Sequence, residues 1–299
     1  MRTWRGVRIT CVGALLLLAA ACARDGAGST GDGPGGDGPG GDPGPADPNA
    51  VVLRVEDVGG FVPPAARLTR VPRVTIYADG RLITEGPQIA IYPGPALPNL
   101  QQQRLTPEQV DRLVEQARAA GVGTATDLGR PPVADVPSTR FTVSSADGGG
   151  TDVLEVYALA ESGENVSGLT EEQRATRAEL QKLVTTLTDL PLSQEKAGEV
   201  QPYRAETIAG VAIPWRPDDN GLDAPPEVAW PGPALPGSPP SSGFDQGCVE
   251  VRGAEVTALL DAAAKANART PWTSGGERWQ VALRPLLPDE RSCADLAAE

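Results

Sequence analysis

Hydrophobic and polar residues alternate in several short segments of the chain, and this period predicts β-strands. The first segment is Val51–Val55, and Asp79-Gly80 separates two more, Val74–Tyr77 and Leu82–Thr84. Asp-Gly between β-forming residues is a strong hairpin signal, because both residues accept the backbone angles of a tight turn. Further strands are predicted at residues 141–145, 153–159, 208–213 and 279–283.

Three other segments have the 3.6-residue period of amphipathic helices. Thr106 followed by Pro107 is typical of a helix start, and Gly121 is typical of a helix end. A second helix is predicted at residues 170–187, with Thr170 as its cap, and a third at 255–268. The positions expected to face the core are Val110, Leu113, Val114 and Ala117 in the first helix, and Leu180, Leu183, Val184 and Leu187 in the second.

These elements predict an α+β fold in which helices pack on antiparallel sheets. The segment Pro93–Pro98, which follows Tyr92, recurs as Pro231–Pro236 after Trp230. The repeat is consistent with two related modules, at residues 51–192 and 200–299, although chance in a Pro- and Ala-rich chain explains it as well. Each Pro-rich segment is expected to be rigid and extended, with Tyr92 or Trp230 holding it to the core.

The N-terminus is expected to be an export signal. Arg2, Arg5 and Arg8 precede an uncharged stretch centred on Leu15–Leu18, which is too short to span a bilayer comfortably. The following Leu-Ala-Ala-Ala-Cys22 resembles the lipobox of bacterial lipoproteins. The resemblance implies a signal peptide at residues 1–21 and acyl chains, such as palmitate, on Cys22. Ordinary signal-peptidase cleavage after Ala21 is the alternative.

A disordered spacer is expected at residues 22–50, because this Gly-, Pro- and Asp-rich stretch has few apolar residues to bury. The predicted location is therefore the extracytoplasmic face of the cell membrane, with the folded part tethered by lipid. Of the four cysteines, Cys248 and Cys293 remain for the folded part once Cys11 leaves and Cys22 is lipidated. In an oxidising compartment these two are expected to form a disulfide.

Charge and composition exclude several classes of function. The formal charge is −13, and loss of three N-terminal arginines lowers it to about −16, so binding to nucleic acid is not expected. The chain has no histidine, which removes Ser-His and Cys-His nucleophile systems and most catalytic zinc sites. No P-loop or Gly-x-Ser-x-Gly motif occurs, and no cofactor, metal site or catalytic residue is predicted.

Two sequence segments carry a weak family resemblance. VPRVTIYADGRLITEG, followed by LTPEQVDRLVEQARAAG, resembles a hairpin-plus-helix module of envelope proteins, and the chain as a whole resembles secreted lipoproteins of unknown function that are common in actinobacteria. The resemblance implies an envelope location and a fold type, and it transfers no active-site residue.

The sequence therefore predicts a membrane-anchored lipoprotein that is more suited to binding or scaffolding than to catalysis. Tyr92 and Trp230 are candidate contacts for an envelope protein or a cell-wall glycan, and core packing is the alternative role for such aromatic residues. A carboxylate-based cell-wall hydrolase and a solute-binding protein are the alternative functions. In a strand, adjacent Glu56 and Asp57 would point to opposite faces, which does not suit a two-carboxylate mechanism.

Overall fold

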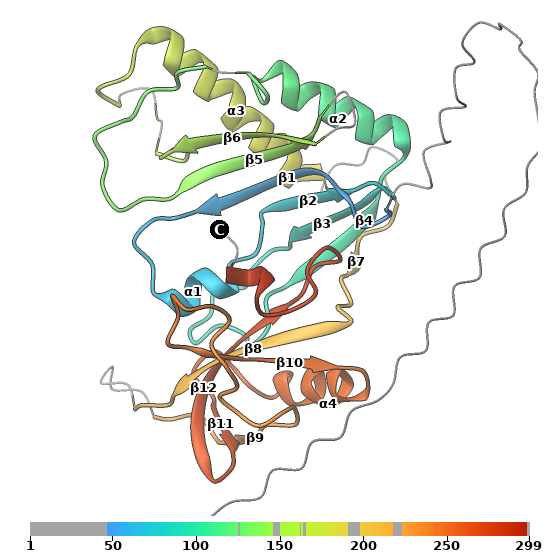
Figure 1. The fold of residues 1–299 in the computed structure, drawn as a ribbon, viewed down its shortest axis with the longest axis vertical. Coiled ribbons are helices and arrows are strands. Elements are labelled where there is room, and N and C mark those ends of the chain that lie inside the picture. Colours follow the sequence, from blue (N-terminus) through green and yellow to red (C-terminus); the bar gives the residue numbers. More distant parts are fainter. Residues whose placement is uncertain are drawn as a thin grey trace, which may run out of the picture. The chain divides into compact units, whose positions relative to one another are not determined.

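The computed structural model describes residues 47–124, 126–145, 150–161, 163, 166–190, 198–217 and 223–297. The predicted signal peptide, Cys22 and most of the predicted spacer lie outside these residues. From Pro45 onward the chain forms one compact unit. In the described part of this unit, two sheets of mostly antiparallel strands pack with four α-helices (Figure 1). This arrangement confirms the α+β class.

The first sheet has seven strands in the order β6-β5-β1-β2-β3-β4-β7, and all its neighbours are antiparallel. The Asp79-Gly80 turn joins β2 to β3, so the predicted hairpin is confirmed. The strands are β1 (Val51–Val58), β2 (Val74–Tyr77), β3 (Arg81–Glu85), β4 (Leu100–Arg104), β5 (Ser138–Ser144), β6 (Thr151–Tyr157) and β7 (Gln201–Pro202).

The second sheet has five strands in the order β10-β8-β12-β11-β9, of which only the β11–β9 pair is parallel. Its central strands, β8 and β12, contain the segments that the hydrophobic pattern predicts at 208–213 and 279–283. The strands are β8 (Thr207–Pro214), β9 (Val228–Ala229), β10 (Gly247–Arg252), β11 (Pro271–Ser274) and β12 (Glu277–Pro285).

The two long helices begin where the sequence predicts. Thr106 and Thr170 each cap a helix, and in both cases a glutamine three residues later completes a capping box. These boxes satisfy backbone N–H groups that the first turn would leave without a partner. The helices are α1 (Pro64–Thr69), α2 (Pro107–Ala119), α3 (Glu171–Asp189) and α4 (Ala254–Ala263), with a short 3-10 helix η2 (Asp295–Ala297).

Helices α2 and α3 cover one face of the first sheet (Figure 1). Alternate residues of the strands point to this face, so Leu53 and Val55 of β1 pack into the core beneath the helices, as do Val74 and Ile76 of β2. All four core positions predicted for α2 are buried, and in α3 Val184 is only partly buried. The apolar stripe of each helix is therefore buried against the apolar face of the sheet.

One arginine in this core was not predicted by the hydrophobic pattern. Arg177 of α3 is fully buried and donates hydrogen bonds to the carbonyl oxygens of Leu128, Tyr157 and Ala158. Without Arg177, these carbonyl oxygens would lose a hydrogen-bond donor inside the protein. Burial lowers the pKa of Arg177, and the three carbonyl contacts compensate for its lost hydration.

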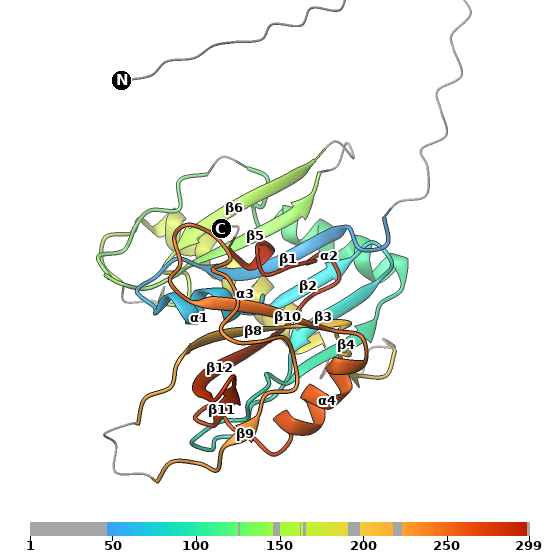
Figure 2. The same cartoon turned by 60° about the horizontal axis from the view of Figure 1, so that its bottom comes forward.

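Part of the opposite face of the first sheet is covered by residues 286–297, which we call the C-terminal segment. Leu287 packs against Tyr77 and Ile83 of the first sheet, and Leu286 packs with Leu68 of α1. Helix α1 contacts η2 and also β8 and β12 of the second sheet. The C-terminal segment and α1 therefore link the two sheets (Figure 2).

The predicted disulfide is confirmed, and it fixes the C-terminal segment. Cys248 of β10 is bonded to Cys293, and both residues are buried. Cys293 also donates its backbone N–H to the Glu250 carboxylate at 2.7 Å. The segment is thus bonded covalently to the second sheet while its side chains lie against the first.

The third predicted helix is shorter than expected. It was predicted to reach residue 268, but α4 ends at Ala263 and turns follow. The reason is tertiary: Ala268 donates its N–H to the carbonyl of Gly94, and Asn267 bridges to Pro95. The sequence pattern also missed α1, β4, β7, β9, β10 and β11, which are short or lack a regular period.

Removal of the disulfide should destabilise the protein substantially. The bond closes a loop with a sequence separation of 45 residues, so replacing both Cys248 and Cys293 with alanine should lower the free energy of unfolding by about 4 kcal/mol. Urea unfolding without reductant measures the change. Reductant should destabilise the wild type and leave the double variant unaffected, and an unchanged urea midpoint in the double variant would contradict the prediction.

Candidate functional site

A charged cavity of about 180 Å³ lies between β1, α1 and the C-terminal segment. Alternation along β1 positions its side chains, since Leu53 and Val55 face the helices while Arg54 and Glu56 face the cavity. Five arginines and five carboxylates line it, so the charges balance. They are Arg54, Arg67, Arg70, Arg140 and Arg284, with Glu56, Asp57, Asp289, Glu290 and Asp295.

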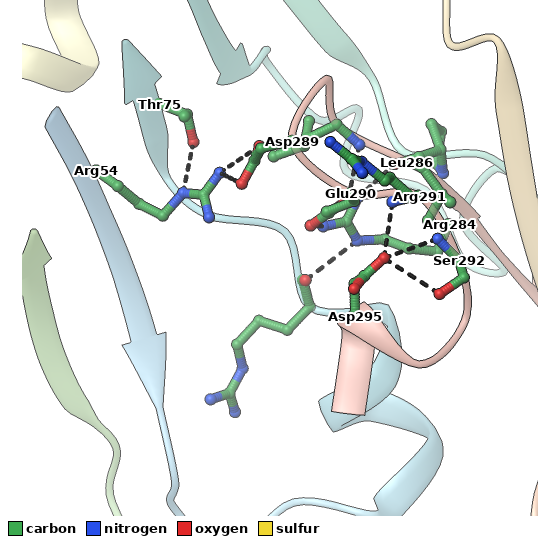
Figure 3. A network of polar contacts seen from close by, with 12 residues as sticks. Arg54, Thr75, Arg284, Leu286, Asp289, Glu290, Arg291, Ser292 and Asp295 are labelled. Atoms are coloured by element: carbon green, nitrogen blue, oxygen red, sulfur yellow. Dashed lines mark hydrogen bonds and ion pairs between the residues drawn. The ribbon is translucent and has the colours of Figure 1, made fainter. Parts of the chain in front are cut away.

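Asp289 of the C-terminal segment connects to two strands of the first sheet. Arg54 donates to both oxygens of the Asp289 carboxylate at 2.8 Å, and its Nε donates to Thr75 at 3.2 Å (Figure 3). The Tyr77 hydroxyl donates to the same carboxylate at 2.7 Å. Burial would lower the pKa of Arg54, but the Asp289 carboxylate raises it above its ordinary value. Burial and Asp289 both raise the pKa of Tyr77, so its hydroxyl keeps its proton.

Glu290, the next residue, makes the second ion pair of the segment. Arg284 of β12 donates to its carboxylate at 2.8 Å, and the side chains of the pair are 1% and 11% exposed. The second carboxylate oxygen accepts the N–H of Leu287 at 2.6 Å, and Arg284 also donates to the carbonyl of Arg70 at 3.2 Å. Breaking such a buried pair by removing one partner typically costs about 3–5 kcal/mol.

Two further cavity residues, Arg70 and Asp295, hold the adjacent backbone. Arg70 donates to the carbonyls of Asp57 and Gly59 at 2.9 and 3.1 Å. Asp295 accepts the N–H groups of Arg291 and Ser292, which fixes the turn before η2 and lowers the Asp295 pKa. Most charged groups of the cavity therefore serve to position the chain.

Glu56 is the exception, because its carboxylate is weakly paired. Its nearest cationic partner is Arg140 at 3.9 Å, and the Glu56 side chain is 25% exposed. Burial raises the pKa of Glu56, against the lowering effects of Arg54 and Arg140. A carboxyl group with a raised pKa can serve as a general acid. Asp57 forms an ion pair with Arg73 at 2.8 Å and accepts a hydrogen bond from Thr139, which lies on the helix face of β5. Adjacent Glu56 and Asp57 therefore point to opposite faces of β1, as the sequence predicts.

The structure places the two aromatic candidates very differently. Tyr92 is 68% exposed, while Trp230 is 8% exposed and packs edge-on against Trp272 with ring centroids 5.5 Å apart. Trp230 also donates from Nε1 to the carbonyl of Pro233 at 2.7 Å. Trp230 thus holds its Pro-rich segment to the core, whereas in the first segment Ala96 and Leu97 take that role, also in the core of the second sheet.

Sequence reasoning did not identify the ion pairs of the charged cavity. Arg54 and Arg284 each interrupt the apolar run of a strand. This interruption was the one sequence signal that a charged group is buried there. Asp289, the partner of Arg54, lies more than 200 residues further along the chain. Glu290, the partner of Arg284, lies six residues further along. No local sequence pattern identifies either pair. Cys22, the predicted lipidation site, lies outside the described residues.

Within the described ranges, no helix is long and apolar enough to cross a membrane, and no group of three or more potential metal ligands occurs. No protein-family model matches the chain, and neither the curated proteins nor the solved structures contain a match.

Glu56 should make stability depend on pH in a defined direction. Its raised folded pKa means that the folded state binds more protons, so stability falls as pH rises from about 4.5 through the folded pKa. Glu56→Gln removes this ionisation and should raise the free energy of unfolding at neutral pH, with the gain vanishing below about pH 4.5. Urea unfolding across pH measures it.

The exposed Glu115 of α2 provides the control, since Glu115→Gln should show no such pH-dependent gain. A Glu56→Gln variant less stable than wild type at neutral pH would contradict the prediction. That result would mean that attraction to Arg140 exceeds the cost of burying the carboxylate.

Proposed function

We propose that this chain is a lipid-anchored protein of the bacterial cell envelope whose folded unit binds a partner protein. The lipobox-like sequence at Cys22 and the Gly/Pro/Asp-rich stretch after it support the anchor and the spacer. A disulfide in the folded unit fits an oxidising, extracytoplasmic compartment. The mutual neutralisation of the arginines and carboxylates in the charged cavity favours binding over catalysis.

The observation that carries the binding role is an exposed apolar stretch, Ile89–Tyr92, between β3 and β4. Ile89 and Ile91 are 65% and 58% exposed, and Tyr92 is also exposed. No charged residue occurs between Gly86 and Asn99. Exposed apolar patches on soluble proteins mark interaction sites, and tyrosine is enriched at protein interfaces.

The surrounding chain holds this stretch in place. At the base of the loop, Gly86 donates its N–H to the carbonyl of Asn99 at 2.6 Å, and the Asn99 side chain donates to Pro87 at 2.9 Å. Beyond Tyr92, the carbonyl of Gly94 accepts from Ala268 at 2.9 Å. A loop fixed at both ends loses less conformational entropy when a partner binds, so this fixation favours affinity.

A partly buried Glu56 with a raised pKa keeps a cell-wall hydrolase as the second candidate function. A retaining or inverting glycosidase would need a second carboxylate opposite it. Asp289 and Glu290 line the same cavity and interact electrostatically with Glu56, but each is already paired with an arginine. Glycan release from purified cell wall by the wild type, and its loss in Glu56→Gln, would favour the hydrolase over the binding role.

The lipid anchor can be tested at Cys22. Cys22→Ala should abolish palmitate labelling and move the protein from the membrane to the soluble fraction, because acyl chains contribute about 0.8 kcal/mol per buried CH2. Fractionation and labelling of cells measure this. Cys11→Ala is the matched control and should leave both unchanged, since this cysteine lies in the predicted signal peptide. A Cys22→Ala protein that stays in the membrane would refute the anchor.

The partner contact can be tested by replacing Ile91 with a photo-crosslinking residue in the lipidated protein in cells. We expect one dominant protein adduct, identified by mass spectrometry, that is absent when the crosslinker replaces the exposed Glu115. Ile91→Asp should weaken copurification of that protein at least tenfold, as expected for a residue at the centre of an interface. Identical adducts at both positions, a glycan adduct, or none at position 91 would refute a protein partner there.

A further inference from the structure

A second and larger cavity, of about 410 Å³, lies beside the C-terminal segment and shares only Glu290 with the charged cavity. Its walls come from β3, β4, the connector between β7 and β8, the end of β10 and the C-terminal segment. Four arginines and two glutamates line it: Arg81, Arg204, Arg252 and Arg291, with Glu206 and Glu290. We call it the arginine cavity.

The charge of this cavity is opposite to that of the chain. The whole sequence has 26 cationic and 39 anionic residues, whereas arginines outnumber carboxylates in the cavity lining. A concave surface of one charge concentrates counterions above their bulk level. In an acidic protein, a local cationic excess of this kind attracts anions that the rest of the surface repels.

Ion pairs already fix the charges at the base of the arginine cavity. Arg81 contacts the Asp79 carboxylate at 2.8 Å and donates to Asn49 at 2.5 Å. Glu290 is neutralised by Arg284 in the buried pair described above. Tyr203 donates its hydroxyl proton to the carbonyl of Leu286 at 2.7 Å. The base is therefore rigid and close to neutral.

The arginines at the rim have few partners. Arg252 donates to the carbonyl of Arg291 at 2.5 Å and meets Glu250 only at 3.9 Å. The guanidinium groups of Arg204 and Arg291 make no hydrogen bond or ion pair within the described part of the chain, and both residues are exposed. Among the described residues that line the cavity, one carboxylate without an ion pair, Glu206, stands against these three cations. Outside the lining, Glu250 meets Arg252 only at 3.9 Å and Asp295 lies near Arg291, so the rim carries excess positive charge.

Arginine side chains favour a particular class of ligand. The planar guanidinium matches the two oxygens of a phosphate or carboxylate, and several arginines around one cavity favour an anion with more than one such group. A volume of 410 Å³ lies in the range of small-molecule sites. From the cavity and its partly unpaired rim, we propose that the arginine cavity binds a small ligand that carries two or more oxyanion groups.

Calorimetric titration of the full chain, purified in neutral detergent, tests this proposal with two probes, pyrophosphate and citrate. Sodium chloride of matched ionic strength provides the blank. Saturable binding at one site is expected, and Arg204→Ala/Arg291→Ala should weaken it at least tenfold. Binding of only one probe would assign the site to phosphate or to carboxylate chemistry, and either result supports an oxyanion site.

The matched control is Arg112→Ala/Arg216→Ala, which removes the same charge from exposed positions outside the cavity and should leave affinity unchanged within about twofold. Arg204→Lys/Arg291→Lys keeps the charge but loses the planar fork, and it should bind with intermediate affinity even if the alanine pair fails to fold. No saturable binding of either probe, or equal weakening in both alanine pairs, would overturn the proposal. Neither outcome depends on the partner contact at Ile91.

Discussion

Two adjacent carboxylates of the C-terminal segment, each paired with an arginine, connect the two sheets of the folded unit. Asp289 accepts from Arg54 and Tyr77 of the first sheet, while Glu290 pairs with Arg284 of the second. Buried ions are stable only when their lost hydration is replaced by close, well-directed partners. The C-terminal segment supplies those partners to both sheets at once, so its position determines how the sheets meet.

The covalent and apolar contacts of the C-terminal segment reinforce these ion pairs. The disulfide at Cys293 fixes the segment to β10, and Leu287 packs against the first sheet. The segment between β3 and β4 makes a second crossing, since Ala96 and Leu97 pack in the core of the second sheet. A sequence division at residues 192–200 would separate the two sheets. The C-terminal segment and the segment between β3 and β4 join them instead.

This arrangement explains why the surfaces proposed for binding lie beside the junction of the sheets. The loop that contains Ile89 and Ile91 is fixed at its base by the contact of Gly86 with Asn99, and beyond Tyr92 by the contact of Gly94 with Ala268, while its apolar side chains are exposed. The arginine cavity forms where the C-terminal segment passes the end of β10, and its rim arginines remain exposed because the nearest buried carboxylate, Glu290, is already paired. The acidic and basic groups of the charged cavity, by contrast, are mostly consumed in holding the chain together.

The sequence by itself determined the elements with a regular period and local end signals, such as the β2–β3 hairpin and the helices that Thr106 and Thr170 cap. It also predicted the disulfide between Cys248 and Cys293, on the expectation that Cys11 is removed and Cys22 lipidated. Only the tertiary structure decided that α4 ends at Ala263, that Trp230 is buried while Tyr92 is exposed, and that Arg54 meets Asp289. Periodicity and capping act over a few residues, whereas these outcomes depend on contacts between distant segments whose energies no local pattern encodes.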